Sequence, residues 1–201
     1  MRPKMKQSIA IIGEGETEWF YFESMRTFHH YSFKMAPDFP RHSDIHHLIG
    51  LAERYLKEGY DYVVCLIDMD RMKDKESEWK KYQKYKKEQK YKDVLFIETR
   101  LCTEFWFLLH FLPRVSAKVY TSQEKLLKEL QKYMPGYEKT KRYFRQTNLY
   151  CYLKQHGDLQ RAIKHAEQLC QLNKNHPEDE IPYSEIYQVI QLLNESEPMK
   201  S

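Results

Sequence analysis

Two aspartates follow a continuous apolar stretch near the middle of the chain. The residues from Tyr62 to Ile67 show no polar alternation, and they lead directly into Asp68-Met69-Asp70. An apolar run of this length is typical of a strand that is buried on both faces of a parallel sheet. In an extended chain, residues i and i+2 point the same way, so the carboxylates of Asp68 and Asp70 are expected to converge.

Two convergent carboxylates repel each other unless a cation lies between them. Oxygen ligands of this kind favour Mg²⁺, Mn²⁺ or Ca²⁺ over zinc. The pair Asp68 and Asp70 therefore predicts a metal site at the end of this strand. The alternative is an acidic turn, because Asp is also a common turn residue.

A second predicted strand also ends in acidic residues. Residues 8–13 are mostly apolar and are followed by Glu14-Gly15-Glu16-Thr17-Glu18. In open α/β sheets, ligands bind in the crevice beyond the carboxyl ends of the strands. Two strands that both end in carboxylates are therefore expected to bring them to the same rim of the sheet.

A third carboxylate, Glu104, lies in the run Cys102 to Phe111, which is apolar apart from Glu104 and His110. Such a run predicts a buried helix that begins just past the preceding strand. Glu104 falls in the first turn, where the helix dipole favours a carboxylate, and this alone accounts for it. The alternative is that the helix delivers Glu104 to the metal. His110 is expected to be a hydrogen-bonded core residue.

Length and composition limit the classes to which the protein can belong. The chain has 201 residues, of which 41% are hydrophobic and 31% are charged, enough for one domain with a substantial core. Its apolar runs fall short of the roughly 20 residues of a membrane span, and the N-terminal apolar stretch leads into Gly-Glu-Gly-Glu and not a signal-peptide cleavage site. The four cysteines lack CxxC spacing, which favours thiols in a reducing cytoplasm.

Positive charge is concentrated in two segments. Residues 71–92 hold ten Lys or Arg against four Asp or Glu, and residues 114–145 hold nine against three, so each has a net charge of +6. Trp79 and several tyrosines are interleaved in the first segment, and Tyr133, Tyr137 and Tyr143 in the second. Basic surface with stacking rings suits a nucleic acid with exposed bases. The alternative is a solvated, lysine-rich helix face.

The elements that must position these residues alternate along the first half of the chain. Strands are expected over residues 8–13, 31–35, 62–70 and 94–98, and helices over 17–28, 45–56, 75–90 and 102–111. This order predicts an α/β fold with a parallel four-stranded sheet flanked by helices. Helices are also expected near 123–133, 159–170 and 186–193, with a loop over 175–182. We therefore expect an α/β core over residues 1–112 and a helical C-terminal extension over 113–201.

With these motifs in view, the chain resembles the RloB-like family, whose core is a Toprim domain related to that of the OLD-family nucleases. The resemblance rests on Glu14-Gly15-Glu16-Thr17-Glu18, on Leu66-Ile67-Asp68-Met69-Asp70 and on the run Cys102 to Phe111. It extends through Tyr137-Glu138-Lys139-Thr140 to the C-terminal region. The chain differs from the family pattern at Arg100-Leu101, where members often carry Asn-Pro, and at Thr103, where they often carry Phe.

The resemblance implies a Toprim-like sheet and phosphodiester chemistry that depends on one or two Mg²⁺ or Mn²⁺ ions. By analogy, Glu14 is the general acid/base or a metal ligand, and Asp68 and Asp70 bind the metal. Glu18 and Glu104 would serve a second metal. Lys139 is a candidate for stabilising the developing charge on the phosphate; the alternative is an ordinary surface lysine.

The expected function is a nuclease that acts on DNA or RNA, in a phage-defence or restriction-linked setting and with a possible partner protein from such a system. One alternative is a Toprim enzyme that acts on small phosphorylated molecules. Another is a subunit that binds nucleic acid without catalysis. No membrane association is expected.

Overall fold

A five-stranded sheet forms the centre of the computed structural model, which describes residues 7–13, 15–36, 44–115 and 120–196. The strand order is β2-β1-β3-β4-β5. Its strands are β1 (Ile9–Ile12), β2 (Lys34–Ala36), β3 (Tyr62–Asp68), β4 (Val94–Arg100) and β5 (Tyr183–Ser184). Strands β1 to β4 pair in parallel, and β5 pairs antiparallel to β4. The prediction of a mostly parallel α/β sheet is confirmed, but the sheet has five strands where four were expected.

The additional strand comes from the C-terminal part of the chain. Thr99 is paired with Ser184 and Arg100 with Tyr183. The backbone N–H of Glu185 donates to the Glu98 carbonyl at 2.8 Å, and the Glu98 N–H donates to the Glu185 carboxylate at 2.9 Å. Within the segment expected to be a loop, a 3₁₀ turn over Pro177–Asp179 precedes this strand. The end of β4 is therefore held on one side by residues from far along the chain.

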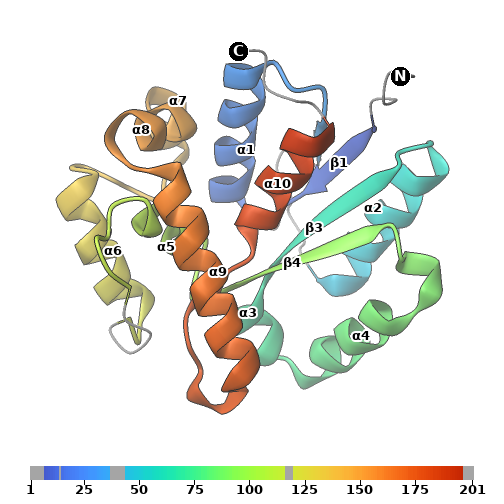
Figure 1. Ribbon diagram of the computed structural model, residues 1–201. Helices are drawn as coiled ribbons and strands as arrows, with labels where there is room; N and C mark the ends of the chain where they lie inside the picture. The colour runs from blue at the N-terminus through green and yellow to red at the C-terminus, as the bar shows by residue number, and fades with distance from the viewer. Residues whose placement is uncertain (1–6, 14, 37–43, 116–119, 197–201) are drawn as a thin grey trace.

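Ten α-helices are described around the sheet. They are α1 (Glu16–His29), α2 (Ile45–Lys57), α3 (Met69–Lys73), α4 (Glu76–Lys87), α5 (Glu104–Leu109), α6 (Gln123–Tyr133), α7 (Lys141–Gln146), α8 (Leu149–His156), α9 (Leu159–Asn175) and α10 (Ile186–Ser196). Helices α2 and α4 lie on one side of the sheet, and α1 and α10 lie on the other (Figure 1). Helices α5 to α9 gather beside α1, with α8 packed along α1 and α9 along α5.

The helix boundaries follow local signals in the sequence. Asp44 caps α2 by accepting a hydrogen bond from the His47 N–H at 2.7 Å, and Ser122 caps α6 by accepting from the Lys125 N–H at 3.3 Å. Gly59, which follows α2, has a φ of +95°, a conformation that glycine adopts at low cost. The helices predicted from the sequence begin within a few residues of their predicted positions.

Helix α5 is the best-buried helix of the fold. All of its residues are buried, which confirms the prediction for the run Cys102 to Phe111. The indole N–H of Trp106 donates to the Tyr21 hydroxyl at 2.9 Å, and His110 Nδ1 lies 3.0 Å from the Trp106 carbonyl. Burial lowers the pKa of His110 to about 4. His110 is therefore a neutral, hydrogen-bonded core residue, as predicted.

The cysteines and the helices were each compared with what the sequence predicts. All four cysteines are free, and Cys65, Cys102 and Cys170 are buried. Among the described helices, none combines the length and the apolar composition needed to cross a bilayer.

Two glycines give opposite predictions for the same substitution. A Cβ at Gly157 would lie 2.7 Å from His110 Cβ and 2.8 Å from the Leu153 carbonyl, whereas a Cβ at Gly50, within α2, meets no atom within 4 Å. Gly157→Ala is expected to lower the free energy of unfolding by about 1–3 kcal/mol through overpacking. Gly50→Ala should raise it by about 0.5–1 kcal/mol through helix propensity. Urea unfolding of both variants checks the prediction, and equal effects would contradict it.

Candidate metal centre

The carboxyl ends of β1 and β3 meet at one edge of the sheet, beside the start of α1. An open cleft of about 290 Å³ lies there. It is lined by Gly15, Glu16, Thr17, Glu18, Asp68, Arg71, Lys139 and Phe144. Glu18 and Asp68, predicted from two separate strand ends, therefore share one cleft. Glu14, the predicted acid/base, lies outside the residues that the structure describes.

Asp68 is both the last residue of β3 and the N-cap of α3. Its Oδ1 accepts hydrogen bonds from the backbone N–H groups of Asp70 and Arg71, at 3.1 and 3.2 Å. Burial and the charge of Asp70 raise the pKa of Asp68, although these hydrogen bonds oppose the shift. The capping geometry thus fixes a partly desolvated carboxylate at the edge of the cleft.

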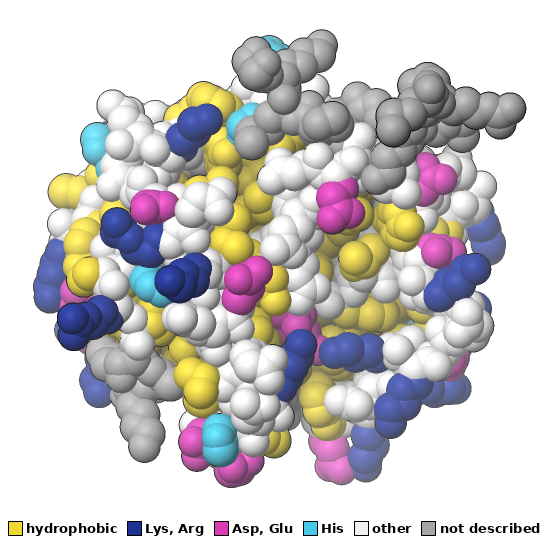
Figure 2. All heavy atoms as spheres, in the orientation of Figure 1, with side chains coloured by type: hydrophobic (Ala, Val, Ile, Leu, Met, Phe, Trp, Pro, Cys, Tyr) yellow, Lys and Arg dark blue, Asp and Glu magenta, His cyan; other side chains and the backbone are white. Residues whose placement is uncertain are grey.

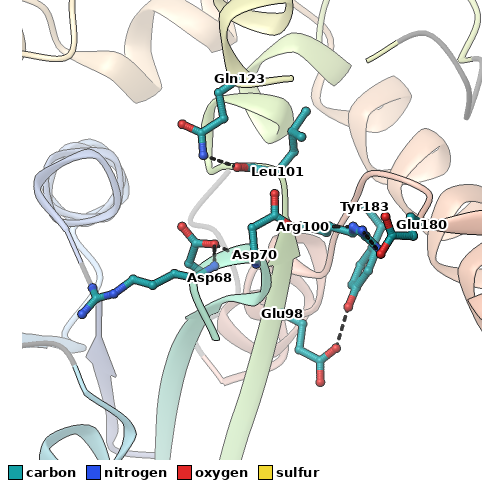
Figure 3. A network of polar contacts seen from close by, with 9 residues as sticks. Asp68, Asp70, Glu98, Arg100, Leu101, Gln123, Glu180 and Tyr183 are labelled. Carbon is teal, nitrogen blue, oxygen red and sulfur yellow. Dashed lines mark hydrogen bonds and ion pairs between the residues drawn. The ribbon is translucent and has the colours of Figure 1, made fainter. Parts of the chain in front are cut away.

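Asp70 does not lie in an extended chain, so the geometry predicted for it is wrong. The strand ends at Asp68, whose side chain caps α3, and Asp70 is already in the first turn of that helix. The two side chains leave the turn in different directions (Figure 3). Asp70 Oδ1 lies 3.5 Å from Arg100 Nε. Asp70 remains close enough to Asp68 to act on its pKa, but its carboxylate faces Arg100.

Glu18 lies in the first turn of α1 and is half-buried at the cleft. Its carboxylate accepts a hydrogen bond from the Thr103 hydroxyl. Burial and the nearby charge of Glu104 raise the pKa of Glu18, and the Thr103 hydrogen bond and Lys139 act against this shift. Glu18 is therefore a second desolvated carboxylate on the same cleft as Asp68.

Glu104 lies behind the cleft and is completely buried, with 0% of its surface exposed. It accepts hydrogen bonds from the Thr17 hydroxyl at 3.2 Å and from the Tyr137 hydroxyl at 2.9 Å, and Lys139 Nζ lies 3.1 Å away. Burial on its own raises a carboxyl pKa, but Lys139 and Tyr137 outweigh it and hold the pKa of Glu104 below its usual value. The same ion pair raises the pKa of Lys139.

The structure thus divides the predicted site into three parts. Glu18, Asp68 and Lys139 line the cleft, Glu104 anchors Lys139 from behind, and Asp70 faces Arg100. The sequence prediction did not include Thr17, Tyr137 and Arg100. Thr17 and Tyr137 lie in the same sequence motifs as Glu18 and Lys139. Their closeness along the chain to these charged residues is the signal that could have identified them.

The donor set fits a hard divalent cation. Burial and neighbouring carboxylates raise the pKa values of both Glu18 and Asp68, and a cation between such groups would relieve this cost. Among the described residues, which exclude Glu14, no three His, Cys, Asp or Glu side chains form a ready-made metal-binding group. A cation at this cleft would therefore be held by Glu18 and Asp68, with further oxygen ligands supplied by residues that move or by substrate.

Mg²⁺ is expected to stabilise the protein more at pH 8 than at pH 5. The pKa values of Glu18 and Asp68 are higher in the folded than in the unfolded state, so without metal the folded protein gains stability as the pH falls and these groups take up protons. Mg²⁺ binds the ionised groups and must compete with those protons. Thermal unfolding with and without Mg²⁺ measures the shift. A shift that is independent of pH, or that survives in Glu18→Gln with Asp68→Asn, would contradict the assignment.

Comparison with known proteins adds the family. A search against curated proteins and a search against solved structures found no match. A family model described as RloB-like protein matches residues 9–193. This range includes the cleft, the Glu104–Lys139 pair and the C-terminal strand. The chain therefore belongs to the RloB-like family.

Proposed function

We propose that the protein is a metal-dependent nuclease that cleaves phosphodiester bonds of DNA or RNA with Mg²⁺ or Mn²⁺ at the cleft of Glu18 and Asp68. The observation that carries the proposal is the composition of this cleft. Two carboxylates with raised pKa values face it together with the side chains of Lys139 and Arg71. Carboxylates suit a divalent cation, and Lys and Arg suit a phosphate.

The chain's own residues have separate roles in this proposal. Asp68 and Glu18 would hold the ion, and Glu14, Asp70 and Glu104 are the further ligands that the family resemblance implies. When bound, the ion would activate a water molecule and stabilise charge on the phosphate oxygens. Glu104 anchors Lys139, whose side chain is still 52% exposed, so the ammonium is held in place and remains within reach of a phosphate.

Surface charge supports a polyanionic substrate at one place in particular. Many lysines of the predicted basic segments have carboxylate partners, including Lys86 with Glu98 and Lys90 with Glu53. Helix α7 stands out by its position, because its exposed residues Lys141, Arg142 and Arg145 lie beside Phe144, which lines the cleft. Lys141 pairs with Glu16 at 3.0 Å, at the same edge. The strongest basic surface in this proposal is therefore α7.

The resemblance of three motifs to Toprim proteins supports the same chemistry, and it suggests a role in phage defence, alone or with a partner protein. The two alternatives to a nuclease can be told apart by their products. An enzyme for small phosphorylated molecules would hydrolyse mononucleotides to phosphate and nucleoside. A non-catalytic subunit would bind nucleic acid and leave it intact.

The test is incubation of purified protein with end-labelled single- and double-stranded DNA and RNA, in Mg²⁺, Mn²⁺ or EDTA. We expect cleavage of at least one substrate in metal and none in EDTA. Turnover of mononucleotides alone would favour the small-molecule enzyme. Binding without cleavage under every metal condition would reject the stand-alone nuclease.

A further inference from the structure

A second and larger cleft lies next to Asp70, at the junction of β4 with the loop that precedes β5. Its volume is about 740 Å³, within the range typical of small-ligand sites. It is lined by Asp70, Asp74, Arg100, Leu101, Tyr120, Thr121, Asp179, Glu180, Ile181 and Pro182. We refer to it as the Arg100 cleft. Apart from Asp70, for which the family resemblance implies a metal, neither the sequence motifs nor the family match assigns its residues a ligand.

Arg100 is the charged residue at the base of this cleft and is only 8% exposed. Its Nη2 lies 2.9 Å from Glu180 Oε1, and its Nε lies 3.5 Å from Asp70 Oδ1 (Figure 3). Its Nη1 is buried and has no hydrogen-bond partner among the described residues. A buried N–H donor without an acceptor destabilises the folded state, and such donors are rare in native structures. Arg100 therefore lines the cleft and has one N–H donor that the described residues leave without an acceptor.

The charges of the lining decide what kind of ligand that is. One guanidinium faces four carboxylates, those of Asp70, Asp74, Asp179 and Glu180. A phosphate would be repelled by this excess of negative charge. A neutral group that carries both acceptors and donors can instead accept from Arg100 and donate to the carboxylates.

The remaining walls suit a flat ring. Leu101, Ile181 and Pro182 are buried and form apolar surface. The ring of Tyr120 is half-buried, with its centroid 6.0 Å from that of Phe105. Aromatic side chains are the usual stacking partners of unpaired bases. Figure 2 is drawn in the orientation of Figure 1. Near the lower centre of this face, apolar side chains lie between basic and acidic ones.

The backbone on both sides of the cleft is held in unusual conformations. Leu101 has a φ of +86° and Glu180 a φ of +53°, although neither is glycine. The Leu101 carbonyl accepts a hydrogen bond from Gln123 Nε2 at 2.7 Å (Figure 3). Such conformations persist where the surroundings enforce them, and they concentrate at ligand sites. Here they flank Arg100 and present Glu180 to it.

We propose that the Arg100 cleft binds one unpaired nucleobase of the substrate, and that guanine is the preferred base. Guanine carries two adjacent acceptors, O6 and N7, which match an arginine. Its N1–H and N2 amino groups are donors for the carboxylates of Glu180 and Asp179, and its ring can stack on Tyr120. This inference rests on the proposed function, because it makes the substrate a nucleic acid with an unpaired guanine beside the scissile linkage.

The test measures binding in EDTA, so it does not depend on cleavage. Fluorescence anisotropy compares short single-stranded oligonucleotides, of both DNA and RNA, that carry one guanine, adenine, inosine or 7-deazaguanine in a pyrimidine background. Wild-type protein is expected to bind the guanine oligonucleotide about tenfold more tightly than the adenine one, because an arginine contact that discriminates between bases is worth about that much. Inosine, which lacks the N2 amino group, and 7-deazaguanine, which lacks N7, should fall between them.

Variants connect the preference to the cleft. Arg100→Met removes the donor, and Glu180→Gln, at a side chain that is 69% exposed, removes a charged acceptor at little risk to folding. Both are expected to reduce the guanine preference to about threefold or less, whereas Arg54→Met, at an exposed arginine paired with Glu58, should retain it. Equal binding of guanine and adenine by wild-type protein, or a preference that persists in folded Glu180→Gln, would overturn the inference. If the protein cleaves nucleic acid but shows no guanine preference, the guanine subsite is rejected and the proposed nuclease stands. If it prefers guanine but does not cleave, the nuclease is rejected and the subsite stands.

Discussion

Replacing Asp68 by asparagine is expected to abolish metal-dependent cleavage while leaving the fold intact. Asparagine caps helices as well as aspartate does, so the hydrogen bonds from the N–H groups of Asp70 and Arg71 are retained. The substitution also removes a carboxylate whose pKa is raised by burial, so it does not cost stability on that account. Loss of one charged ligand should weaken metal binding and lower the cleavage rate at least about 10³-fold.

The matched control is Asp44→Asn. Asp44 caps α2 through the same kind of hydrogen bond, from the His47 N–H, and does not line the candidate metal cleft. Both variants should melt within about 2 °C of wild type, since the cap is preserved. Single-turnover cleavage at saturating Mg²⁺ should separate them, with Asp44→Asn fully active. Cleavage by Asp68→Asn at the wild-type rate would remove Asp68 from the metal site.

Lys139→Met is expected to destabilise the protein by about 2–4 kcal/mol, because it leaves Glu104 buried without its cation. A loss of this size lowers the melting temperature by roughly 5–10 °C for a chain of this length. In wild type the pKa of Glu104 is depressed, so its contribution to stability is complete above its usual pKa and is lost as the pH falls through the lower folded value. In the variant, burial is opposed only by hydrogen bonds such as that from Tyr137, so the pKa of Glu104 rises above its wild-type value. The defect should therefore be largest near pH 8 and shrink toward pH 5.

A double-mutant cycle separates the ion pair from other effects. Glu104→Gln added to Lys139→Met removes the stranded charge, so the double variant should be more stable than Lys139→Met alone. Lys141→Met provides the control, because Lys141 pairs with Glu16 at the surface and its loss should cost no more than about 0.5 kcal/mol. Urea unfolding at pH 5 and pH 8 supplies the free energies. Costs that simply add would show that Lys139 and Glu104 are not coupled.

The sequence predicted the parts of the fold that have a strong local signal. Strands β1 and β3 are almost entirely apolar and β4 begins with four apolar residues, and helices such as α6 and α9 show both a cap and an apolar period. Strand β5 has only two residues, too few for any period, and it follows a proline-bearing segment. Its pairing with Thr99 and Arg100 depends on tertiary contact alone.

For the candidate site, the sequence predicted that Asp68 and Glu18 would lie close together, but not how the side chains around them are oriented. Asp68 and Glu18 share a cleft because parallel strands end at one rim, which is a rule of topology. The orientation of Asp70 could not follow from the alternation of an extended chain, because the capping of α3 by Asp68 ends the strand first. The hydrogen bonds of Glu104 with Tyr137 and Lys139 join residues that are 33 and 35 positions apart. These contacts could not be predicted, because hydrophobic periodicity reports on single helices and strands and not on contacts between distant segments.

The closure of the sheet by β5 has a consequence for how the protein is made. The hydroxyl of Thr99 meets that of Ser184 at 3.2 Å across 85 positions of sequence, so β4 emerges from the ribosome long before its partner. Until residues 183–185 are synthesised, the edge of β4 beside Asp70 and Arg100 has no neighbour and the Arg100 cleft lacks one wall. A nascent chain can form β1 to β4 first, but the Arg100 cleft is completed only when residues 179–185 have been synthesised. If the protein cuts nucleic acid as proposed, full substrate recognition would thus wait for the synthesis of β5.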